Sequence, residues 1–379
     1  MSQDEFWQAV AGCTHFLPDH YRKSMKDWLQ EVADSPLAEL RGDRYGSGGF
    51  VGELEKEVAE MLGKEAAVFM PSGTMAQQIA LRIWSDRANV PTVAFHPRCH
   101  LQIHEQMAYR ELHGLEAVLL GDGPRLFTFE DLQAVERPLS TLLIEFPERE
   151  IGGQLPTWDE FQAIVAFAKE RGIRMHLDGA RLWECQPYFG RSYAEIVADF
   201  DSVYVSVYKA LRGLPGAILA GPADFIAEAR IWLRRHGGNL FTMAPNAIAA
   251  KIGMDRHLPK IPLYVSKATE VAQILSELPG VVVEPKVPPT NMMHLYFQAP
   301  VDRLLDAAGQ IALDEKCALI WGAQETPRGT KVELWIGDAG LDIPEPRLRE
   351  LLTRLCTLAE TQPHSPRPAF RPHLRTANS

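Results

Sequence analysis

The segments RMHLDGAR at residues 174–181 and DSVYVSVYKALRGLPG at residues 201–216 decide how this chain folds. Each contains a short apolar run that is typical of a buried strand. Asp178 lies at the carboxyl end of the first predicted strand, and Lys209 lies just past the second. In a parallel sheet both strand ends open onto one edge, which is where α/β folds bind their ligands. We therefore expect Asp178 and Lys209 to share a site.

Further apolar runs precede and follow these two segments, with helix-length segments such as 51–63 and 158–172 between them. The additional strand candidates are AAVFM (66–70), PTVAF (91–95), EAVLL (116–120), STLLIEF (140–146) and GAILAG (216–221). Short continuous apolar strands separated by helices indicate a mainly parallel sheet covered on both faces. The sequence thus predicts an α/β fold with a seven-stranded type of sheet.

A smaller α+β domain is expected after this sheet. Its strand candidates are NMMHLYF (291–297) and KVELWIG (331–337). The last stretch is Pro-rich and basic, which favours disorder. We predict an N-terminal segment at 1–45, a large domain at 46–255, a small C-terminal domain at 256–361 and a disordered tail at 362–379.

Composition narrows the class of protein. The chain has 379 residues and a net charge of −10, so it has no basic field to attract nucleic acid or anionic lipid. No apolar run approaches the roughly 18 residues that a membrane helix needs, and the acidic start does not suit a secretory signal. The five cysteines are scattered and form no C-x-x-C pair. We expect a cytoplasmic protein without nucleic-acid or membrane partners.

The pair Asp178 and Lys209 suits pyridoxal 5′-phosphate chemistry. A buried carboxylate keeps the pyridine nitrogen of this cofactor protonated, and a lysine amine forms a Schiff base with its aldehyde. Taken singly, Asp178-Gly179 is also a common turn dipeptide and Lys209 could be a solvated loop lysine. Their joint position on two strand ends favours the cofactor.

Two other motifs bear on this hypothesis. PSGT at 71–74 stands between a strand and a helix, where backbone N–H groups and hydroxyls can hold a phosphate, although Ser72 or Thr74 could simply cap the helix. His96, His100 and His104 recur every four residues. That spacing raises a metal site, but Pro97 interrupts a continuous helix and the order is not H-E-x-x-H. An imidazole stacked on a cofactor ring is the better functional interpretation, and a structural histidine is the alternative.

These motifs, taken together with RYGSGG at 44–49, resemble the threonine aldolase and β-eliminating lyase family. Members of this family are pyridoxal-phosphate enzymes of fold type I, which is the fold of aspartate aminotransferase. The resemblance covers roughly residues 40–300 in order and continues more thinly to about residue 355. It implies that the cofactor is pyridoxal 5′-phosphate.

The resemblance also implies a role for each matching residue. Lys209 would be the Schiff-base lysine, Asp178 the partner of the pyridine nitrogen, His100 the stacking and catalytic histidine, and Ser72, Gly73 and Thr74 the phosphate ligands. Arg181 would lie near the cofactor O3′ and bind the substrate carboxylate. Tyr45 and Gly46 match a segment that lies near the active site and can serve a neighbouring subunit. Asn291 and Met292 match the start of a strand in the small domain.

Three positions depart from the family pattern. Where the family has a histidine that is a candidate base, this chain has Glu148, followed by Arg149. Phe241 falls near a phosphate-binding arginine, and Glu333 falls near the arginine that pairs with the substrate carboxylate, with Arg328 a possible substitute. A carboxylate in place of that cation would repel an ordinary amino acid. Glu148 is a candidate base and Arg149 a candidate carboxylate ligand, with a solvated surface loop PERE at 147–150 as the alternative.

The function implied is a lyase that cleaves a β-hydroxy-α-amino acid into glycine and an aldehyde. The alternatives are β-elimination, another pyridoxal-phosphate reaction on an unusual amine, and a non-catalytic relative that keeps only the fold. A homodimer or homotetramer is expected, because the glycine-rich loop around Tyr45 matches a segment that crosses a subunit interface in the family.

Overall fold

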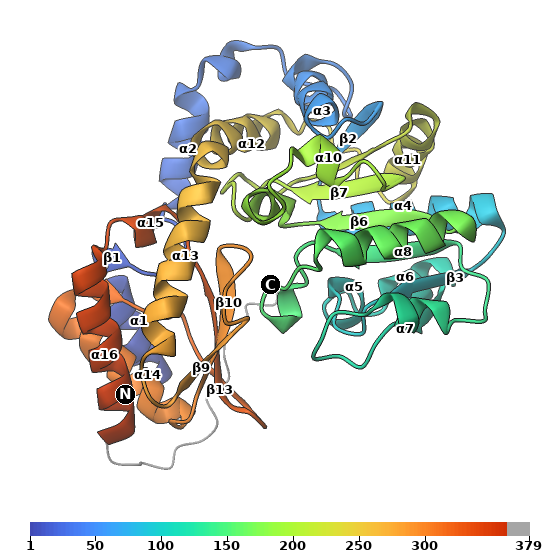
Figure 1. Ribbon diagram of the computed structural model, residues 1–379. Coiled ribbons are helices and arrows are strands. Elements are labelled where there is room, and N and C mark those ends of the chain that lie inside the picture. Colours follow the sequence, from blue (N-terminus) through green and yellow to red (C-terminus); the bar gives the residue numbers. More distant parts are fainter. Residues whose placement is uncertain (362–379) are drawn as a thin grey trace. The chain divides into compact units, whose positions relative to one another are not determined.

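The computed structural model describes residues 1–361, which form two compact units (Figure 1). The larger unit is Lys23–Pro259, and the smaller unit combines Met1–Arg22 with residues 260–361. The tail predicted at 362–379 lies outside the described residues. Within residues 1–361, no helix has both the length and the apolar character needed to cross a membrane.

The larger unit is built on a seven-stranded sheet in the order β2-β8-β7-β6-β5-β3-β4. Its strands are β2 (Ala66–Met70), β3 (Thr92–Phe95), β4 (Glu116–Leu119), β5 (Thr141–Glu145), β6 (Arg174–Gly179), β7 (Ser202–Ser206) and β8 (Ala217–Gly221). Neighbouring strands run parallel, except that β8 is antiparallel to both β2 and β7. Every strand falls within a predicted apolar run, and the predicted mainly parallel α/β sheet is confirmed.

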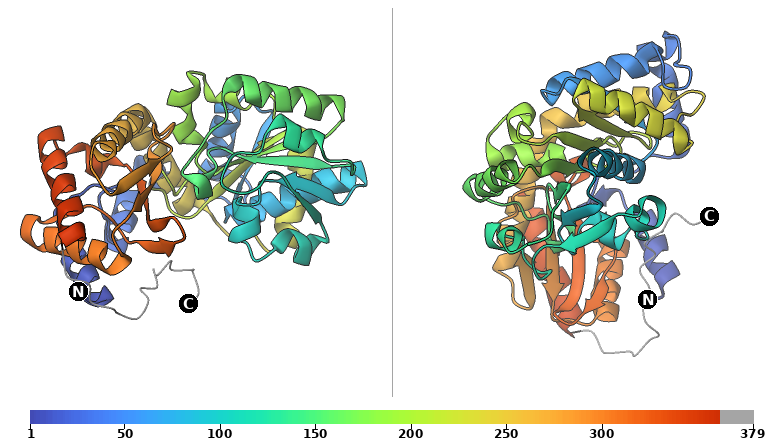
Figure 2. Two further views of the ribbon diagram at one scale, coloured as in Figure 1. Left: turned by 60° about the horizontal axis from the view of Figure 1, so that its bottom comes forward. Right: turned by 90° about the vertical axis from the view of Figure 1, so that its right-hand side faces the viewer.

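Helices lie on both faces of this sheet (Figures 1 and 2). Side chains of α4 and α11 share one apolar core with Val68 and Met70 of β2, whereas the intervening Phe69 donates its backbone N–H to Glu55 of α3 at 2.7 Å. The helices of this unit are α2 (Met25–Asp34), α3 (Gly49–Met61), α4 (Gly73–Ala88), α5 (His100–Ile103), α6 (Ala108–His113), α7 (Phe129–Gln133), α8 (Trp158–Glu170), α9 (Gln186–Phe189), α10 (Tyr193–Ile196), α11 (Ala223–Arg235) and α12 (Ala244–His257), with the 3-10 turns η1 (Pro36–Glu39), η2 (Arg149–Ile151) and η3 (Leu182–Cys185).

Local sequence explains where the central helices begin. Ser72 Oγ accepts the Met75 N–H at the start of α4, and Thr157 and Glu160 form a reciprocal capping box at the start of α8. β5, β6 and β7 each carry a polar residue at or near the carboxyl end, namely Glu145, Asp178 and Ser206. The sheet is thus an apolar platform with its chemistry gathered at one edge.

The smaller unit contains an antiparallel sheet in the order β12-β13-β10-β9 and a two-stranded parallel pair, β1-β11. Its strands are β1 (His15–Phe16), β9 (Val281–Glu284), β10 (Met292–Phe297), β11 (Cys317–Ala318), β12 (Gln324–Thr326) and β13 (Gly329–Trp335). Its helices are α1 (Gln3–Ala11), α13 (Ile261–Ser276), α14 (Val301–Glu315), α15 (Asp338–Leu341) and α16 (Glu345–Thr361), and the turn η4 (Leu258–Lys260) leads into it. The predicted strands at 291–297 and 331–337 are present as β10 and β13.

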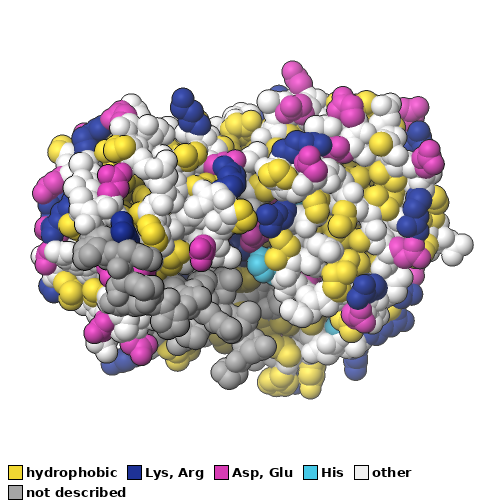
Figure 3. Space-filling view, turned by 90° about the horizontal axis from the view of Figure 1, so that it is seen from below, with side chains coloured by type: hydrophobic (Ala, Val, Ile, Leu, Met, Phe, Trp, Pro, Cys, Tyr) yellow, Lys and Arg dark blue, Asp and Glu magenta, His cyan; other side chains and the backbone are white. Residues whose placement is uncertain are grey.

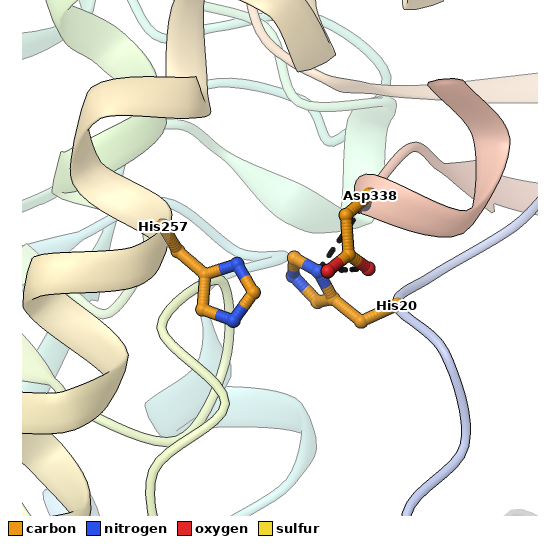
Figure 4. Close-up of side chains that lie close together, drawn as sticks. All are labelled: His20, His257 and Asp338. Atoms are coloured by element: carbon orange, nitrogen blue, oxygen red, sulfur yellow. Dashed lines mark hydrogen bonds and ion pairs between the residues drawn. The ribbon is translucent and has the colours of Figure 1, made fainter. Parts of the chain in front are cut away.

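The N-terminus differs from the predicted separate segment at 1–45. Its first 22 residues belong to the smaller unit, because β1 pairs with β11 and buried side chains of α1 such as Phe6 join the same core as α14. The backbone N–H of Asp338 donates to His20 Nδ1 at 3.2 Å, and Asp338 Oδ1 lies 3.0 Å from the same nitrogen (Figure 4). Residues distant in sequence therefore hold the N-terminal segment in place.

The surface carries charges of both signs, and the cysteines lie beneath it. Acidic and basic side chains are interspersed on the face shown in Figure 3. All five cysteines are buried and free.

Candidate active site

The ends of three adjacent strands assemble the centre of the candidate site. In the parallel register of β5 and β6, Glu145 pairs with Asp178, and in that of β6 and β7, Asp178 pairs with Tyr204. Lys209 follows β7 in a turn that is closed by the Gly213 N–H to the Val207 carbonyl at 2.9 Å. The structure thus places Asp178 and Lys209 at one sheet edge, and adds Glu145 beside them.

Asp178 is buried, with 2% of its surface exposed. Its Oδ1 accepts the Ala180 N–H at 3.0 Å, and its Oδ2 accepts the side-chain amide of Gln77. A carboxylate with both oxygens satisfied by N–H donors is stabilised as an anion even away from water.

The surroundings of Lys209 favour the neutral amine form of its side chain. Burial and the Arg181 guanidinium lower the pKa of Lys209, while Asp178 and Glu145 act in the opposite direction. Within residues 1–361, Lys209 Nζ makes no side-chain hydrogen bond of its own. A lysine whose neutral form is favoured is the nucleophile that attacks a carbonyl carbon.

The PSGT motif forms the turn from β2 into α4. Ser72 caps the helix, and Thr74 lies in its first turn. A Cβ at Gly73 would lie 2.1 Å from Tyr204 Oη, so only glycine fits under that phenol. The 16-residue helix α4 directs its N-terminal N–H groups and positive dipole end at this turn. An anion can be held here by the backbone and the two hydroxyls.

His100 is oriented by two glutamates. Its Nδ1 lies 2.9 Å from Glu105 Oε1, and its backbone N–H donates to Glu145 Oε2 at 3.1 Å. Glu105 is itself buried and accepts the Gln78 amide at 2.7 Å. Burial alone lowers the pKa of His100, but the hydrogen bond and charge of Glu105 outweigh it, so the net shift is upward. An imidazole fixed in this way keeps one ring orientation.

The other two histidines of the motif have different partners. His96 Nδ1 accepts the Arg98 N–H at 3.1 Å, and its Nε2 lies 2.8 Å from the Arg125 carbonyl. His104, beyond the end of α5, places Nε2 2.9 Å from Glu150 Oε1. The regular four-residue spacing therefore does not correspond to one continuous helix, because α5 spans only His100–Ile103.

Glu148 and Glu145 form a second pair of acids beside Asp178. Glu148 is 2% exposed, its Oε2 lies 3.6 Å from His96 Nδ1, and its Oε1 has no hydrogen-bond partner among the described residues. Burial, followed by repulsion from Glu145 and Asp178, raises the pKa of Glu148 well above its usual range. Burial and repulsion from Asp178 raise the pKa of Glu145 to about 7. Glu145 can therefore exchange protons near neutral pH, whereas Glu148 holds its proton to a higher pH than an ordinary carboxyl does.

The two candidate carboxylate-binding arginines already contact glutamates. Arg149 Nη1 lies 3.0 Å from Glu150 Oε1, and Arg181 Nη1 lies 3.3 Å from Glu184 Oε1. Arg181 Nε, by contrast, is buried and has no hydrogen-bond partner within residues 1–361. An orphaned guanidinium N–H is costly unless a ligand oxygen completes it.

Tyr45 and Phe241 lie together in the larger unit. Both are 61% exposed, their rings meet edge to face at 5.6 Å, and the Tyr45 N–H donates to the Phe241 carbonyl at 2.9 Å. Phe241, which replaces an expected arginine, thus belongs to an exposed aromatic pair.

The remaining predicted residues belong to the smaller unit. Buried Asn291 donates its amide to the Ile336 carbonyl at 2.7 Å, and Met292 begins β10. Glu333 Oε2 lies 3.6 Å from His294 Nε2. Arg328, considered as a substitute carboxylate ligand, is paired with Glu284.

The residues of the larger unit fit the cofactor that the resemblance implies. Gly73 keeps the α4 turn open, Lys209 offers an amine, Asp178 offers an anion and Arg181 Nε offers an unused donor. Glu145, Gln77 and Tyr204 were not singled out from the sequence. A glutamate ending the apolar strand STLLIEF, and a pair of glutamines inside the apolar helix MAQQIAL, were the available signals.

Comparisons with known proteins agree with this geometry. The model of the β-eliminating lyase family matches residues 33–298. The chain is 29% identical over 273 residues to low-specificity L-threonine aldolase 1 of Arabidopsis thaliana, covering 68% of this chain and 75% of the other. A solved structure from Listeria monocytogenes EGD-E, provisionally assigned as an L-allo-threonine aldolase, is 39% identical with a TM-score of 0.90, over 94% of this chain and 99% of that one. A protein from Exiguobacterium sp. 255-15, provisionally assigned as an aromatic amino acid β-eliminating lyase/threonine aldolase, is 38% identical with the same TM-score, over 93% and 99%.

Proposed function

This chain belongs to the β-eliminating lyase family, and from that premise we propose that it is a pyridoxal-phosphate-dependent lyase cleaving a β-hydroxy-α-amino acid into glycine and an aldehyde. The observation that carries the proposal is the pairing of buried, doubly hydrogen-bonded Asp178 with Lys209, whose pKa is lowered, at one sheet edge. A scaffold protein without chemistry has no need for a buried anion facing a lysine that burial favours as a neutral amine.

The cofactor, when bound, supplies an electron-accepting ring that holds the electron pair released as the Cα–Cβ bond breaks. Lys209 would attach it covalently, and Asp178 would stabilise the protonated ring nitrogen. Ser72, Gly73 and Thr74 would bind the phosphate at the α4 N-terminus. His100, held by Glu105, would stack on the ring. Arg181, with its unused Nε, would bind an oxygen of the substrate carboxylate or of the cofactor.

Proton transfer is the step in which this chain departs from the family pattern, because Glu148 stands where the family has a histidine. The β-hydroxyl proton must move to a base as the Cα–Cβ bond breaks, and a proton must then reach Cα to give glycine. We assign the first transfer to Glu148. Its raised pKa makes its ionised form a stronger base than an ordinary carboxylate, provided that the pH is high enough to ionise it. Arg149 would help to bind the substrate carboxylate.

Exposed apolar side chains support an assembly of several copies. Tyr45, Leu240 and Phe241 are exposed aromatic and aliphatic groups on neighbouring loops of the larger unit. We propose a homodimer or a dimer of dimers in which these loops contact a second copy. The protein would act in the cytoplasm, where free cysteines such as its five remain reduced, and its net charge of −10 supports a small-molecule substrate over nucleic acid.

The test is a product analysis of the purified protein loaded with pyridoxal phosphate. L-threonine, L-allo-threonine, β-phenylserine and serine would be supplied, and glycine, aldehyde, ammonia and 2-oxo acid measured separately. We expect glycine and aldehyde in equal amounts from at least one hydroxy amino acid. Ammonia and a 2-oxo acid without glycine would instead identify an elimination reaction, and no product from any substrate would contradict the lyase proposal.

A further inference from the structure

A buried chain of side-chain hydrogen bonds runs back from Asp178 into the core of the larger unit. The Gln77 amide donates to Asp178, and Gln77 Oε1 lies 2.6 Å from His176 Nε2. His176 Nδ1 lies 2.8 Å from Ser202 Oγ, which accepts the Trp84 indole N–H at 2.8 Å. All five side chains are at most 3% exposed. The chain links α4, β6 and β7.

The Gln77 end sets the direction of the bonds in this chain. The Gln77 side-chain N–H donates to Asp178 Oδ2, so Gln77 Oε1 faces His176 and accepts from Nε2–H. A neutral His176 with its proton on Nε2 has an acceptor at Nδ1, to which the Ser202 hydroxyl donates while it accepts the Trp84 indole N–H.

The central imidazole is neutral. Burial lowers the pKa of His176 to about 3, and its hydrogen bonding to Ser202 offsets this only partly. Lys209 and Arg181 are cations that act on this edge of the sheet, whereas the side chains of Gln77, Ser202 and Trp84 carry no charge. A neutral imidazole can orient the Gln77 amide through hydrogen bonds without placing a further charge near Asp178.

We propose that Gln77 is a positioning residue that holds Asp178 as an oriented anion, with His176, Ser202 and Trp84 fixing the direction of its amide. The inference rests on the proposed function, in which Asp178 serves the ring nitrogen of the cofactor. Gln77 lies one helical turn after Gly73, so the helix whose N-terminus would bind the phosphate also sets the anion for the ring. Its neighbour Gln78 serves the stacking histidine through Glu105.

The first test uses protein without cofactor. Nitrogen-15 NMR of the histidine side chains should show His176 as the neutral Nε2–H tautomer, unchanged from pH 5 to pH 9. Gln77→Met should alter that signal, because the acceptor of the Nε2–H is lost. This readout does not depend on catalysis, so it separates failure of the inference from failure of the proposed function. A protonated His176 or an Nδ1–H tautomer in the wild-type protein would overturn the inference.

The second test uses the loaded enzyme. Gln77→Met should lower kcat by about 10- to 100-fold with little change in KM, since a hydrogen bond to a charged group is lost. The kcat of Gln77→Glu should rise relative to the kcat of wild type as the pH falls, because only a protonated carboxyl can donate a hydrogen bond to Asp178. A purely structural glutamine would give two variants with the same pH dependence, and that outcome would also overturn the inference.

The matched control is Gln162→Met. Gln162 on α8 likewise donates its amide to an aspartate, Asp199, at 3.0 Å, but it lies outside the site. We expect its kcat, pH dependence and His176 signal to stay at wild-type values. Comparable losses in both glutamine variants, with equal losses of thermal stability, would show that the effect at Gln77 is general destabilisation and contradict the inference.

Discussion

Asp178 and Glu148 are both buried acids near the carboxyl ends of neighbouring strands, yet their surroundings differ. Asp178 accepts N–H donors on both oxygens, whereas Glu148 Oε1 has no hydrogen-bond partner among the described residues and Oε2 is 3.6 Å from His96. Burial and like charge raise the pKa of Glu148 well above its usual range. The comparison teaches that two acids of equal exposure can differ in the N–H donors that folding provides, and such donors favour the ionised form of a carboxyl group.

The difference suits two tasks in one reaction. A ring nitrogen that must stay protonated needs a permanent anion, while a β-hydroxyl needs a group that accepts a proton and gives it back. Glu145, in register with Asp178, has a pKa of about 7, because burial and the Asp178 charge raise it while the charges of His100 and Lys209 lower it.

The largest effect is expected from removing the amine that the Asp178 anion faces. Lys209→Ala should abolish covalent attachment of the cofactor and reduce turnover below detection, because no other group at this edge offers an amine to the aldehyde. The fold should persist, since a lysine at a sheet edge is not a core residue. Absorbance spectra before and after borohydride treatment check this, and a wild-type spectrum in the variant would refute the assignment of Lys209.

The next effect tests Asp178 as the permanent anion. Asp178→Asn keeps the shape but cannot carry the charge, and we expect kcat to fall by roughly 10²-fold or more while some cofactor remains bound. Steady-state kinetics with the best substrate of the panel, at saturating cofactor, measure it. A kcat within about threefold of wild type would mean that the ring nitrogen is not controlled at this position.

A smaller effect is expected at the exchangeable acid. Glu148→Gln should lower kcat by about tenfold or more with little change in cofactor affinity, because general bases contribute on the order of 10²-fold or more. It should also remove the acidic limb of the pH–rate profile, since activity rises with pH as Glu148 ionises through its raised pKa. The control Glu53→Gln makes the same change at an exposed position on α3. An unchanged profile in Glu148→Gln would place the base elsewhere, with Glu145 and His104 the next candidates.

The smallest effect is expected in thermal stability, and it tests whether Glu148 is protonated in the folded protein. The pKa of Glu148 is higher in the folded than in the unfolded protein, so the folded state holds its proton more tightly. The stability that this proton contributes is present below the ordinary carboxyl pKa and is lost as the pH rises through the folded one. Glu148→Gln should therefore gain melting temperature relative to wild type as the pH rises above the ordinary carboxyl pKa of 4.5, by roughly 2 °C or more. Parallel melting curves at all pH values would count against a protonated Glu148.

The sheet and its principal site residues were accessible from sequence because their signals are local. An apolar run of five or six residues specifies a buried strand wherever it lies in the chain, and parallel strands place their carboxyl ends together. Asp178, Lys209 and the PSGT turn each follow such a run directly. The N-terminal 22 residues carried no comparable signal, since their place depends on pairing with β11, about 300 positions away.

By itself, then, the sequence determined the alternation of strands and helices, the family and the identity of the Asp178–Lys209 pair. Only the tertiary structure decided the protonation of the acids around that pair. The register of β5 against β6 brings Glu145 beside Asp178, folding buries Glu148 near His96, and α4 brings Gln77 to Asp178 from 101 positions away. The physical reason is that a strand depends on its own residues, whereas a pKa depends on burial and on donors that folding gathers from distant segments.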